Sequence, residues 1–188
     1  MLNEEFGLRS GGILNHVAAF EIPGGRKLVF HTDGGMNIAP NLEEKRQILW
    51  NTITALHRLG IEQPKVAVLA ANEQVNPKMP ATVDAKALVE MADEFPSCII
   101  EGPVAMDVAV SADAAAHKGI ASRIAGDADI FLVPTIEAGN LLGKSLVYYA
   151  GAKIAGVVLG ATHPIVMVSR ADDAQAKLHS IALASLLV

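Results

Sequence analysis

Short runs of uninterrupted apolar residues are the feature that most constrains the fold of this chain. Strands with one solvated face alternate apolar and polar residues, whereas continuous runs are typical of parallel strands that are covered on both faces. The segments between the runs carry apolar residues at helical spacing. The sequence therefore predicts an α/β fold with strands near 66–70, 97–100, 130–133 and 156–159.

The helical segments have recognisable ends. Asn41 and Glu44 form a capping-box pair ahead of the apolar positions that recur up to Gly60, where the first helix should end. A second helix should start near Asp84. We expect two further helices, over 139–149 and from Asp172 or Asp173 to about 186.

The beginning of the chain has a different pattern. Strand-like runs at 17–22 and 27–32 are joined by Pro23, Gly24 and Gly25, which is turn chemistry typical of a hairpin. We therefore expect a mixed, mostly parallel sheet flanked by helices, with an antiparallel pair near one edge.

Composition excludes several classes of protein. Hydrophobic residues make up 51% of the 188 residues and the formal net charge is −5, so a buried core is expected and nucleic acid is not an expected partner. The acidic start and the absence of a long apolar stretch lead us to expect a cytoplasmic chain without a membrane span. A single cysteine, Cys98, excludes an internal disulfide, and the six histidines lack metal-ligand spacing, so no metal or permanently bound cofactor is expected.

Nucleotide-binding signatures are weak. The chain has no G-x-G-x-x-G motif, and the segment 138–145 only approaches a phosphate-binding loop, because Ala138 stands where such a loop needs glycine. An ordinary helix start after a strand is the favoured interpretation of this segment.

Two other segments have alternative interpretations. Asp33, Gly34 and Gly35 follow a strand, and they form either a tight connection to the next helix or a wall of a binding cleft. The segment 163–173 ends an apolar run with Ser169, Arg170, Asp172 and Asp173. These residues either form an anion site beside a helix N-terminus or simply cap that helix, with Asp172 as the N-cap.

Several sequence blocks, taken together and in order, resemble the phosphate acetyl/butyryltransferase family, in particular its phosphate butyryltransferase branch. The resemblance runs over nearly the whole chain. The blocks that carry it are 7–11 (GLRSG), 32–40 (TDGGMNIAP), 76–82 (NPKMPAT), 101–103 (EGP), 136–140 (IEAGN) and 164–172 (PIVMVSRAD).

The resemblance implies a fold like that of isocitrate and isopropylmalate dehydrogenases, with two α/β domains and a cleft between them. The middle domain would comprise residues 20–155, and residues 1–19 and 156–188 would belong to the other domain. Family members usually carry a substantial segment ahead of the first block, so we expect this other domain to be incomplete.

The resemblance also implies the reversible reaction of acyl-CoA with phosphate to give acyl phosphate and CoA, with butyryl-type substrates favoured over acetyl. Ser169 and Arg170 would be catalytic, Ser169 by stabilising an oxyanion and Arg170 by binding phosphate or CoA. Arg9 would bind the phosphoryl group. The remaining expected substrate-binding residues are Ser10, Asp33, Gly139, Asn140, Pro164, Asp172 and Asp173.

One role stays unassigned. Acetyltransferases of the family use an aspartate in the helix after the Ser–Arg pair to take the thiol proton of CoA, and an ungapped match places Ala176 there. The alternative hypothesis is a catalytically inactive, truncated homologue that acts as an oligomerising or CoA-binding domain. On either hypothesis we expect a homo-oligomer, because an incomplete domain would expose apolar surface.

Overall fold

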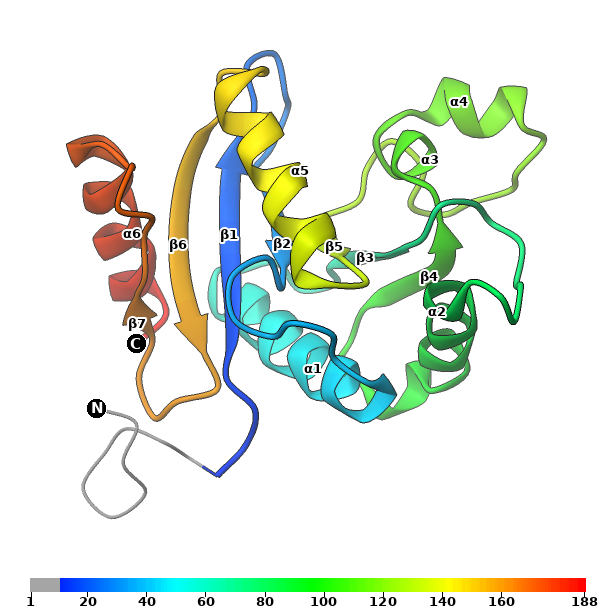
Figure 1. Ribbon diagram of the computed structural model, residues 1–188, viewed down its shortest axis with the longest axis horizontal. Coiled ribbons are helices and arrows are strands. Elements are labelled where there is room, and N and C mark those ends of the chain that lie inside the picture. The colour runs from blue at the N-terminus through cyan, green and yellow to red at the C-terminus, as the bar shows by residue number, and fades with distance from the viewer. Residues whose placement is uncertain (1–10) are drawn as a thin grey trace.

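The computed structural model describes residues 11–188, which form a seven-stranded sheet with helices on both faces (Figure 1). The strand order is β4-β3-β5-β2-β1-β6-β7. Strands β1 and β7 run opposite to the other five, so the sheet is mixed and mostly parallel, as expected. The strands are β1 (Asn15–Glu21), β2 (Val29–Thr32), β3 (Lys65–Leu69), β4 (Ile99–Val104), β5 (Ile130–Leu132), β6 (Lys153–Leu159) and β7 (Ile165–Val166).

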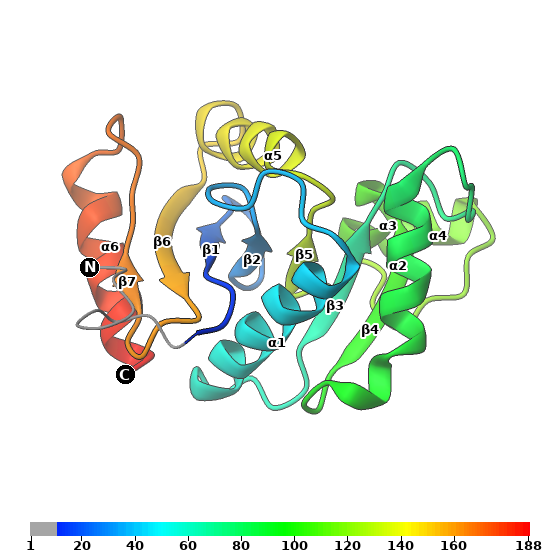
Figure 2. The ribbon, with the colours of Figure 1, turned by 60° about the horizontal axis from the view of Figure 1, so that its bottom comes forward.

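Helices cover the two faces of the sheet in separate groups, as the two ribbon views show (Figures 1 and 2). Helices α1 and α2 pack on one face, and α3, α4 and α5 pack on the other, while α6 lies along the β6–β7 edge. The helices are α1 (Leu42–Arg58), α2 (Pro80–Glu90), α3 (Met106–Val110), α4 (Ala112–His117), α5 (Ile136–Tyr148) and α6 (Ala174–Leu186), with a 3-10 turn at Ala92–Glu94.

Alternation along β1 divides the core between the two faces. Val17 and Ala19 pack under α1, whereas Ala18 and Phe20 pack under α5. All four side chains are buried. Each strand of this part of the sheet therefore contributes to two cores, which explains the continuous apolar runs in the sequence.

Helix α1 begins as predicted. The Asn41 side chain accepts from the backbone N–H of Glu44, and the Glu44 carboxylate accepts from the backbone N–H of Asn41. This capping box satisfies two N–H groups that would otherwise have no partner at the helix start. Helix α5 contains the whole 138–145 segment, which confirms that this segment is helical.

Four expectations about local structure are wrong. The β1–β2 pair lies inside the sheet instead of near an edge, because β6 pairs with the free side of β1. The continuous apolar run of β6 predicted a parallel strand, but β6 pairs antiparallel with both of its neighbours, β1 and β7. Helix α2 begins at Pro80, four residues before the predicted start. Asp173, not Asp172, is the N-cap of α6, and it accepts from the N–H of Ala176 at 2.8 Å.

The predicted domain boundaries, after residues 19 and 155, fall inside β1 and β6 of one continuous sheet. The division into domains stays a prediction.

Within residues 11–188, no helix is both long and apolar enough to cross a membrane.

Candidate functional site

A cavity lies on the α5 face of the sheet, between the loop that follows β2 and the helix that follows β5; β2 and β5 are adjacent parallel strands. From β2 the chain continues into α1 on one face of the sheet, and from β5 it continues into α5 on the other. The two connections therefore leave neighbouring strands toward opposite faces of the sheet. Open α/β sheets commonly bind ligands next to such a point.

The cavity has a volume of about 300 Å³ and collects residues from five parts of the chain. Its walls come from β1, the end of β2 and its following loop, α5, β6, and the segment between β7 and α6. The lining residues include His16, His31, Gly34, Gly35, Gly139, Asn140, Gly143, Lys144, Gly156, Met167, Ser169 and Asp172. In the sequence these positions spread from residue 16 to residue 172, so only folding brings them together.

Asp33 holds the loop that follows β2. Its Oδ1 accepts from the N–H groups of Gly35 and Met36 at 2.8 Å each, and its Oδ2 accepts from the N–H of His16 at 3.0 Å and from Asn37 Nδ2 at 2.6 Å. The carboxylate is buried. Asp33 thereby fixes the Gly34–Gly35 wall of the cavity against β1.

Glycines line this cavity because other backbone and two imidazole rings approach them closely. A Cβ added to Gly34 would lie 2.6 Å from His31 Cε1, and one added to Gly143 would lie 2.9 Å from His31 Nε2. A Cβ added to Gly139 would lie 2.6 Å from the Cα of Gly34. Neither Gly34 nor Gly35 has a positive φ. Close approach, and not a special turn, therefore explains this glycine pair, and the pair does form a cavity wall.

His16 and His31 lie at the base of the cavity on the α5 face of the sheet. They are diagonal neighbours, since Val17 of β1 pairs with Thr32 of β2 and Ala18 pairs with His31. The Nδ1 atom of each ring is buried without a hydrogen-bond partner.

Burial lowers the pKa of both imidazoles. For His31 burial is the main cause and the pKa falls to about 4, with the nearby His16 lowering it further. For His16 burial also dominates, although Asp33, the Met167 carbonyl and Asp172 act in the opposite direction. Both rings are therefore neutral near pH 7.

The Ser169–Asp172 segment forms a closed turn at the rim of the cavity. Asp172 Oδ2 accepts from the N–H of Ser169 at 2.8 Å, and Ser169 Oγ accepts from the N–H of Ala171 at 3.3 Å. Ser169 and Asp172 line the cavity, and Arg170 between them is exposed to solvent. Ser169 therefore lies in a turn and Arg170 is solvated, as the capping interpretation expected, although Asp173 and not Asp172 caps the helix; the same turn also borders the cavity.

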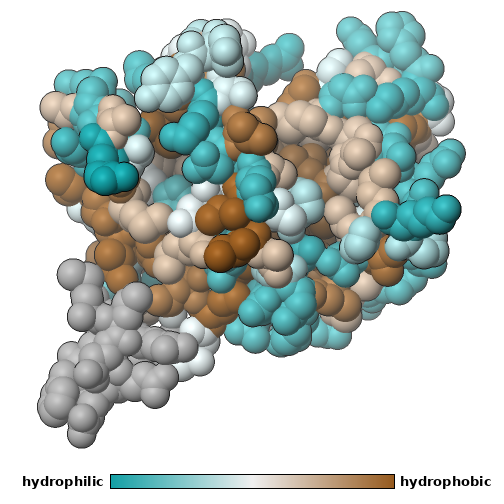
Figure 3. All heavy atoms as spheres, in the orientation of Figure 1, coloured by the Kyte–Doolittle hydropathy of each residue, from teal (hydrophilic) through white to brown (hydrophobic). Residues whose placement is uncertain are grey.

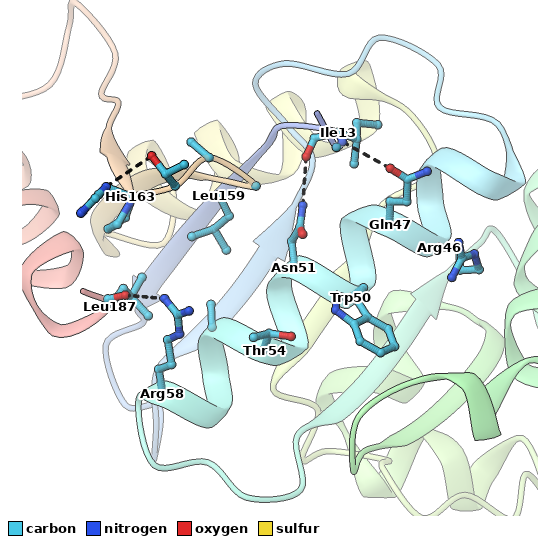
Figure 4. Close-up of a pocket in the computed structure, with 16 residues that line it drawn as sticks. Ile13, Arg46, Gln47, Trp50, Asn51, Thr54, Arg58, Leu159, His163 and Leu187 are labelled. Atoms are coloured by element: carbon cyan, nitrogen blue, oxygen red, sulfur yellow. Dashed lines mark hydrogen bonds between the residues drawn. The ribbon is translucent and has the colours of Figure 1, made fainter. Parts of the chain in front are cut away.

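A second, larger hollow of about 490 Å³ lies on the α1 face (Figure 4). It is lined by Arg46, Trp50 and Arg58 of α1 and by the turn between β6 and β7, including His163. Arg58 donates to the Leu187 carbonyl at 2.8 Å across this hollow. Of the predicted substrate-binding residues that fall within 11–188, this hollow contains only Pro164.

The structure therefore brings together part of the predicted site. Gly139, Asn140, Ser169 and Asp172 line the first cavity, and Asp33 shapes its wall. Asp173 caps α6 beside it, and Pro164 lies in the second hollow. The predicted residues Arg9 and Ser10 lie outside the described residues. Over the described range, no cluster of three or more His, Cys, Asp or Glu side chains is arranged to hold a metal ion.

Sequence reasoning missed His16, His31 and Lys144 as cavity residues. The histidines were interpreted singly, because they lack any ligand spacing. The available signal was strand alternation, which places His16 on the same face of β1 as Ala18, the cross-strand partner of His31.

Comparisons with known proteins identify the family. The family model described as "Phosphate acetyl/butaryl transferase" matches residues 6–185. The chain belongs to this family. It is 56% identical over 98% of its length to a Bacillus subtilis protein named "Probable phosphate butyryltransferase", and 44% identical over 98% of its length to a Thermotoga maritima phosphate acetyltransferase. It spans 62% and 63% of the lengths of these two relatives.

Solved structures agree with the fold. The phosphate acetyl/butyryltransferase chain matches a branched-chain phosphotransacylase from Enterococcus faecalis with a TM-score of 0.93 and 41% identity, covering 100% of this chain and 67% of that one. A 4-hydroxythreonine-4-phosphate dehydrogenase from Klebsiella pneumoniae matches with a TM-score of 0.51 and 15% identity, covering 90% of this chain and 54% of that one. The second match shows a shared fold alone, and it agrees with the expected dehydrogenase-like architecture.

Proposed function

We propose that this chain transfers a short acyl group between CoA and inorganic phosphate. Membership of the phosphate acetyl/butyryltransferase family supports the reaction class. The observation that carries the proposal for this chain is the cavity between the loop after β2 and helix α5, where blocks 32–40, 136–140 and 164–172 meet. Those blocks are far apart in sequence, and their convergence on one hollow favours a shared substrate site.

The residues at this cavity fit the steps of acyl transfer. Ser169 lines the cavity, and we assign to its hydroxyl the hydrogen bond to the oxyanion of a tetrahedral intermediate. Lys144 lines the cavity, and the exposed Arg170 lies next to Ser169 in the chain; we assign to both the positive charge that phosphate or the phosphates of CoA require. Arg9 is assigned to the phosphoryl group through the family motif.

We further propose that the acyl group is butyryl or branched, not acetyl. Apolar side chains of Ala18, Val147, Ile154, Met167 and Val168 line the same cavity as the polar groups. They offer an apolar surface that a longer acyl chain would cover and that an acetyl group would leave partly hydrated.

The test measures CoA released from acetyl-CoA, butyryl-CoA and isobutyryl-CoA in the presence of phosphate. We expect wild-type turnover with the two longer substrates, and a loss of roughly a hundredfold or more in kcat/KM in Arg170→Gln. Arg26→Gln changes an exposed arginine in the β1–β2 turn and is the matched control.

Failure of the wild type to release CoA above a protein-free reaction would contradict the proposal. CoA binding without turnover would then favour the inactive CoA-binding homologue.

A homo-oligomer is proposed as the form in solution. The outer side of α6 exposes Leu178, Ile181 and Leu186 by 57%, 53% and 67%. Hydrophobic residues, coloured brown, are also exposed on the face of the molecule seen in Figure 3. Light scattering on the assay sample tests this proposal, and a monomer at high concentration would exclude it.

A further inference from the structure

The second hollow, on the α1 face, has no part in the acyl transfer proposed above. Its volume of about 490 Å³ lies within the range of small-molecule sites, roughly 300–1,000 Å³. The first cavity lies on the α5 face, so the sheet separates the two. The second hollow therefore has room for a ligand of its own.

Side chains of α1 fix one wall of the second hollow. Gln47 Oε1 accepts from the N–H of Ile13 at 3.3 Å, and Asn51 Nδ2 donates to the Ile13 carbonyl at 3.1 Å (Figure 4). Asn51 Nδ2 also donates to the buried Asn15 at 3.0 Å. This wall is therefore formed without a ligand, as in most small-molecule sites.

The charges around the second hollow favour an anion. Within residues 11–188, its lining includes Arg46, Arg58 and His163 but no Asp or Glu. Arg46 is already paired, because the Glu43 carboxylate accepts from its Nε and Nη2 at 2.7 Å each. In the described part of the chain, Arg58 has one partner, the Leu187 carbonyl at 2.8 Å from Nη1. This contact holds the guanidinium and leaves its other N–H groups for an anion.

Trp50 gives the same hollow an aromatic surface. Its side chain lines the hollow and is 43% exposed. The indole N–H of Trp50 and the hydroxyl of Thr54 have no hydrogen-bond partner among residues 11–188. Planar rings such as nucleobases stack on aromatic side chains of this kind.

The spacing of these groups selects an elongated ligand. Trp50, Thr54 and Arg58 follow one another along one side of α1, across from the β6–β7 turn (Figure 4). Eight residues of helix separate Trp50 from Arg58 by about 12 Å along the axis. A compact anion reaches only one of them, whereas a ligand with a flat ring at one end and negative charge at the other contacts both.

We propose that the second hollow binds a nucleoside phosphate, with its base on Trp50 and its phosphate on Arg58. Thr54 lies between these two residues on the helix, at the level of the sugar. A free nucleotide and the nucleotide end of CoA share this chemistry. The site is independent of the acyl-transfer cavity.

Other classes of ligand fit the second hollow less well. A cation finds no carboxylate side chain in its lining within residues 11–188. A purely apolar ligand would cover the Arg58 guanidinium, the Thr54 hydroxyl and the Trp50 indole N–H without giving them partners, which opposes binding.

Trp50 is the single tryptophan of the chain, so its fluorescence reports on this hollow. AMP, adenosine, inorganic phosphate and CoA are titrated separately into the full chain, with excitation at the red edge of the indole band, where adenine absorbs little. We expect AMP to change the emission saturably, and adenosine and phosphate to bind at least about tenfold more weakly. Tighter binding of CoA than of AMP would assign the hollow to the nucleotide end of CoA, and weaker binding would assign it to a free nucleotide.

Two substitutions separate the two ends of the ligand. Arg58→Gln removes the charge and should weaken AMP by about tenfold or more, with adenosine unchanged. Trp50→Leu, followed by calorimetry, should weaken AMP by about tenfold and leave phosphate unchanged. Arg26→Gln, in the turn at the other end of β1, is the matched control, and circular dichroism checks the fold of each variant.

No AMP or CoA binding to the wild type up to millimolar concentration, by fluorescence and by calorimetry, would overturn the proposal without recourse to any variant. An Arg58→Gln protein that binds AMP as tightly as the wild type would overturn it as well. No readout here uses turnover, so a negative result leaves the proposed acyl transfer untouched, and failure of the acyl-transfer assay leaves this site untouched.

Discussion

Buried polar groups on the two faces of strands β1 and β2 differ in whether they have hydrogen-bond partners. On the α1 face, Asn15 Nδ2 donates to Thr32 Oγ1 at 3.0 Å and to Thr52 Oγ1 at 3.2 Å, and Asn15 Oδ1 accepts from Asn51 Nδ2 at 3.0 Å. On the α5 face, the next residues in sequence, His16 and His31, each keep a buried Nδ1 without a partner.

This difference between the two faces bears on which buried polar groups stabilise the fold. A buried polar group without a partner costs free energy, so native proteins rarely keep one unless it serves another purpose. In the Asn15 network the side-chain amide is fully hydrogen-bonded, as expected of a buried group that stabilises the fold. The two imidazoles leave Nδ1 atoms unpaired beside the cavity, so they add less to the stability of the fold than the Asn15 network does.

The largest expected effect concerns the pH dependence of stability. His31 has a pKa of about 4 in the folded protein and an ordinary value of 6.5. The unfolded state therefore binds the proton first, so folded stability is fully present above pH 6.5 and is lost as the pH falls toward 4. The loss from this residue is about 3 kcal/mol.

Denaturant unfolding at pH 7 and pH 4.5 in wild type and His31→Leu measures this effect. The variant should lose less stability between the two pH values, with the remaining slope shared by His16 and other groups. Equal losses in both proteins would contradict a neutral, buried His31.

The second prediction disturbs the α5 face without changing a polar group. A methyl group at Gly156 would collide with the Met167 carbonyl and lie 2.8 Å from His16 Nε2. Displacement of the Met167–Ser169 segment should lower kcat/KM in Gly156→Ala by about a hundredfold. Steady-state assays check this, with Gly12→Ala as control because an added Cβ there meets nothing within 4 Å. Equal activity in the two variants would mean that the segment tolerates movement.

The third prediction concerns the α1 face. Thr52→Val removes one acceptor of Asn15 and leaves a buried amide N–H unpaired. The free energy of unfolding should fall by about 1–3 kcal/mol, while kcat per folded molecule stays unchanged. A variant of normal stability with reduced kcat would reverse the assignment of the two faces.

The sequence predicted those parts of the fold that depend on local pattern. The capping box at Asn41 and the strands β3 and β5 follow from spacing and continuous apolar runs. The direction of β6 could not be predicted, because an antiparallel strand covered on both faces has the same apolar run as a parallel one.

The candidate site was partly predictable for a similar reason. Family motifs indicated Gly139, Asn140, Ser169 and Asp172, which do line one cavity. The two histidines have no motif, and their place at the cavity follows from the register of β1 with β2. That register is a property of the folded protein, and no local sequence pattern reports it.

The single carboxylate of Asp33 has a consequence for how such a chain can diversify. It binds the amides of one cavity wall and that of β1 at once, so this side of the hollow can only vary together with the centre of the sheet. On the opposite side, Gly139 and Gly143 of α5 are held by close packing, but the apolar side chains further along α5 and in the turn before α6 are not tied to the sheet in this way. Changes in acyl preference among relatives should therefore accumulate there, at positions such as Val147 and Val168, while the glycine loop stays constant.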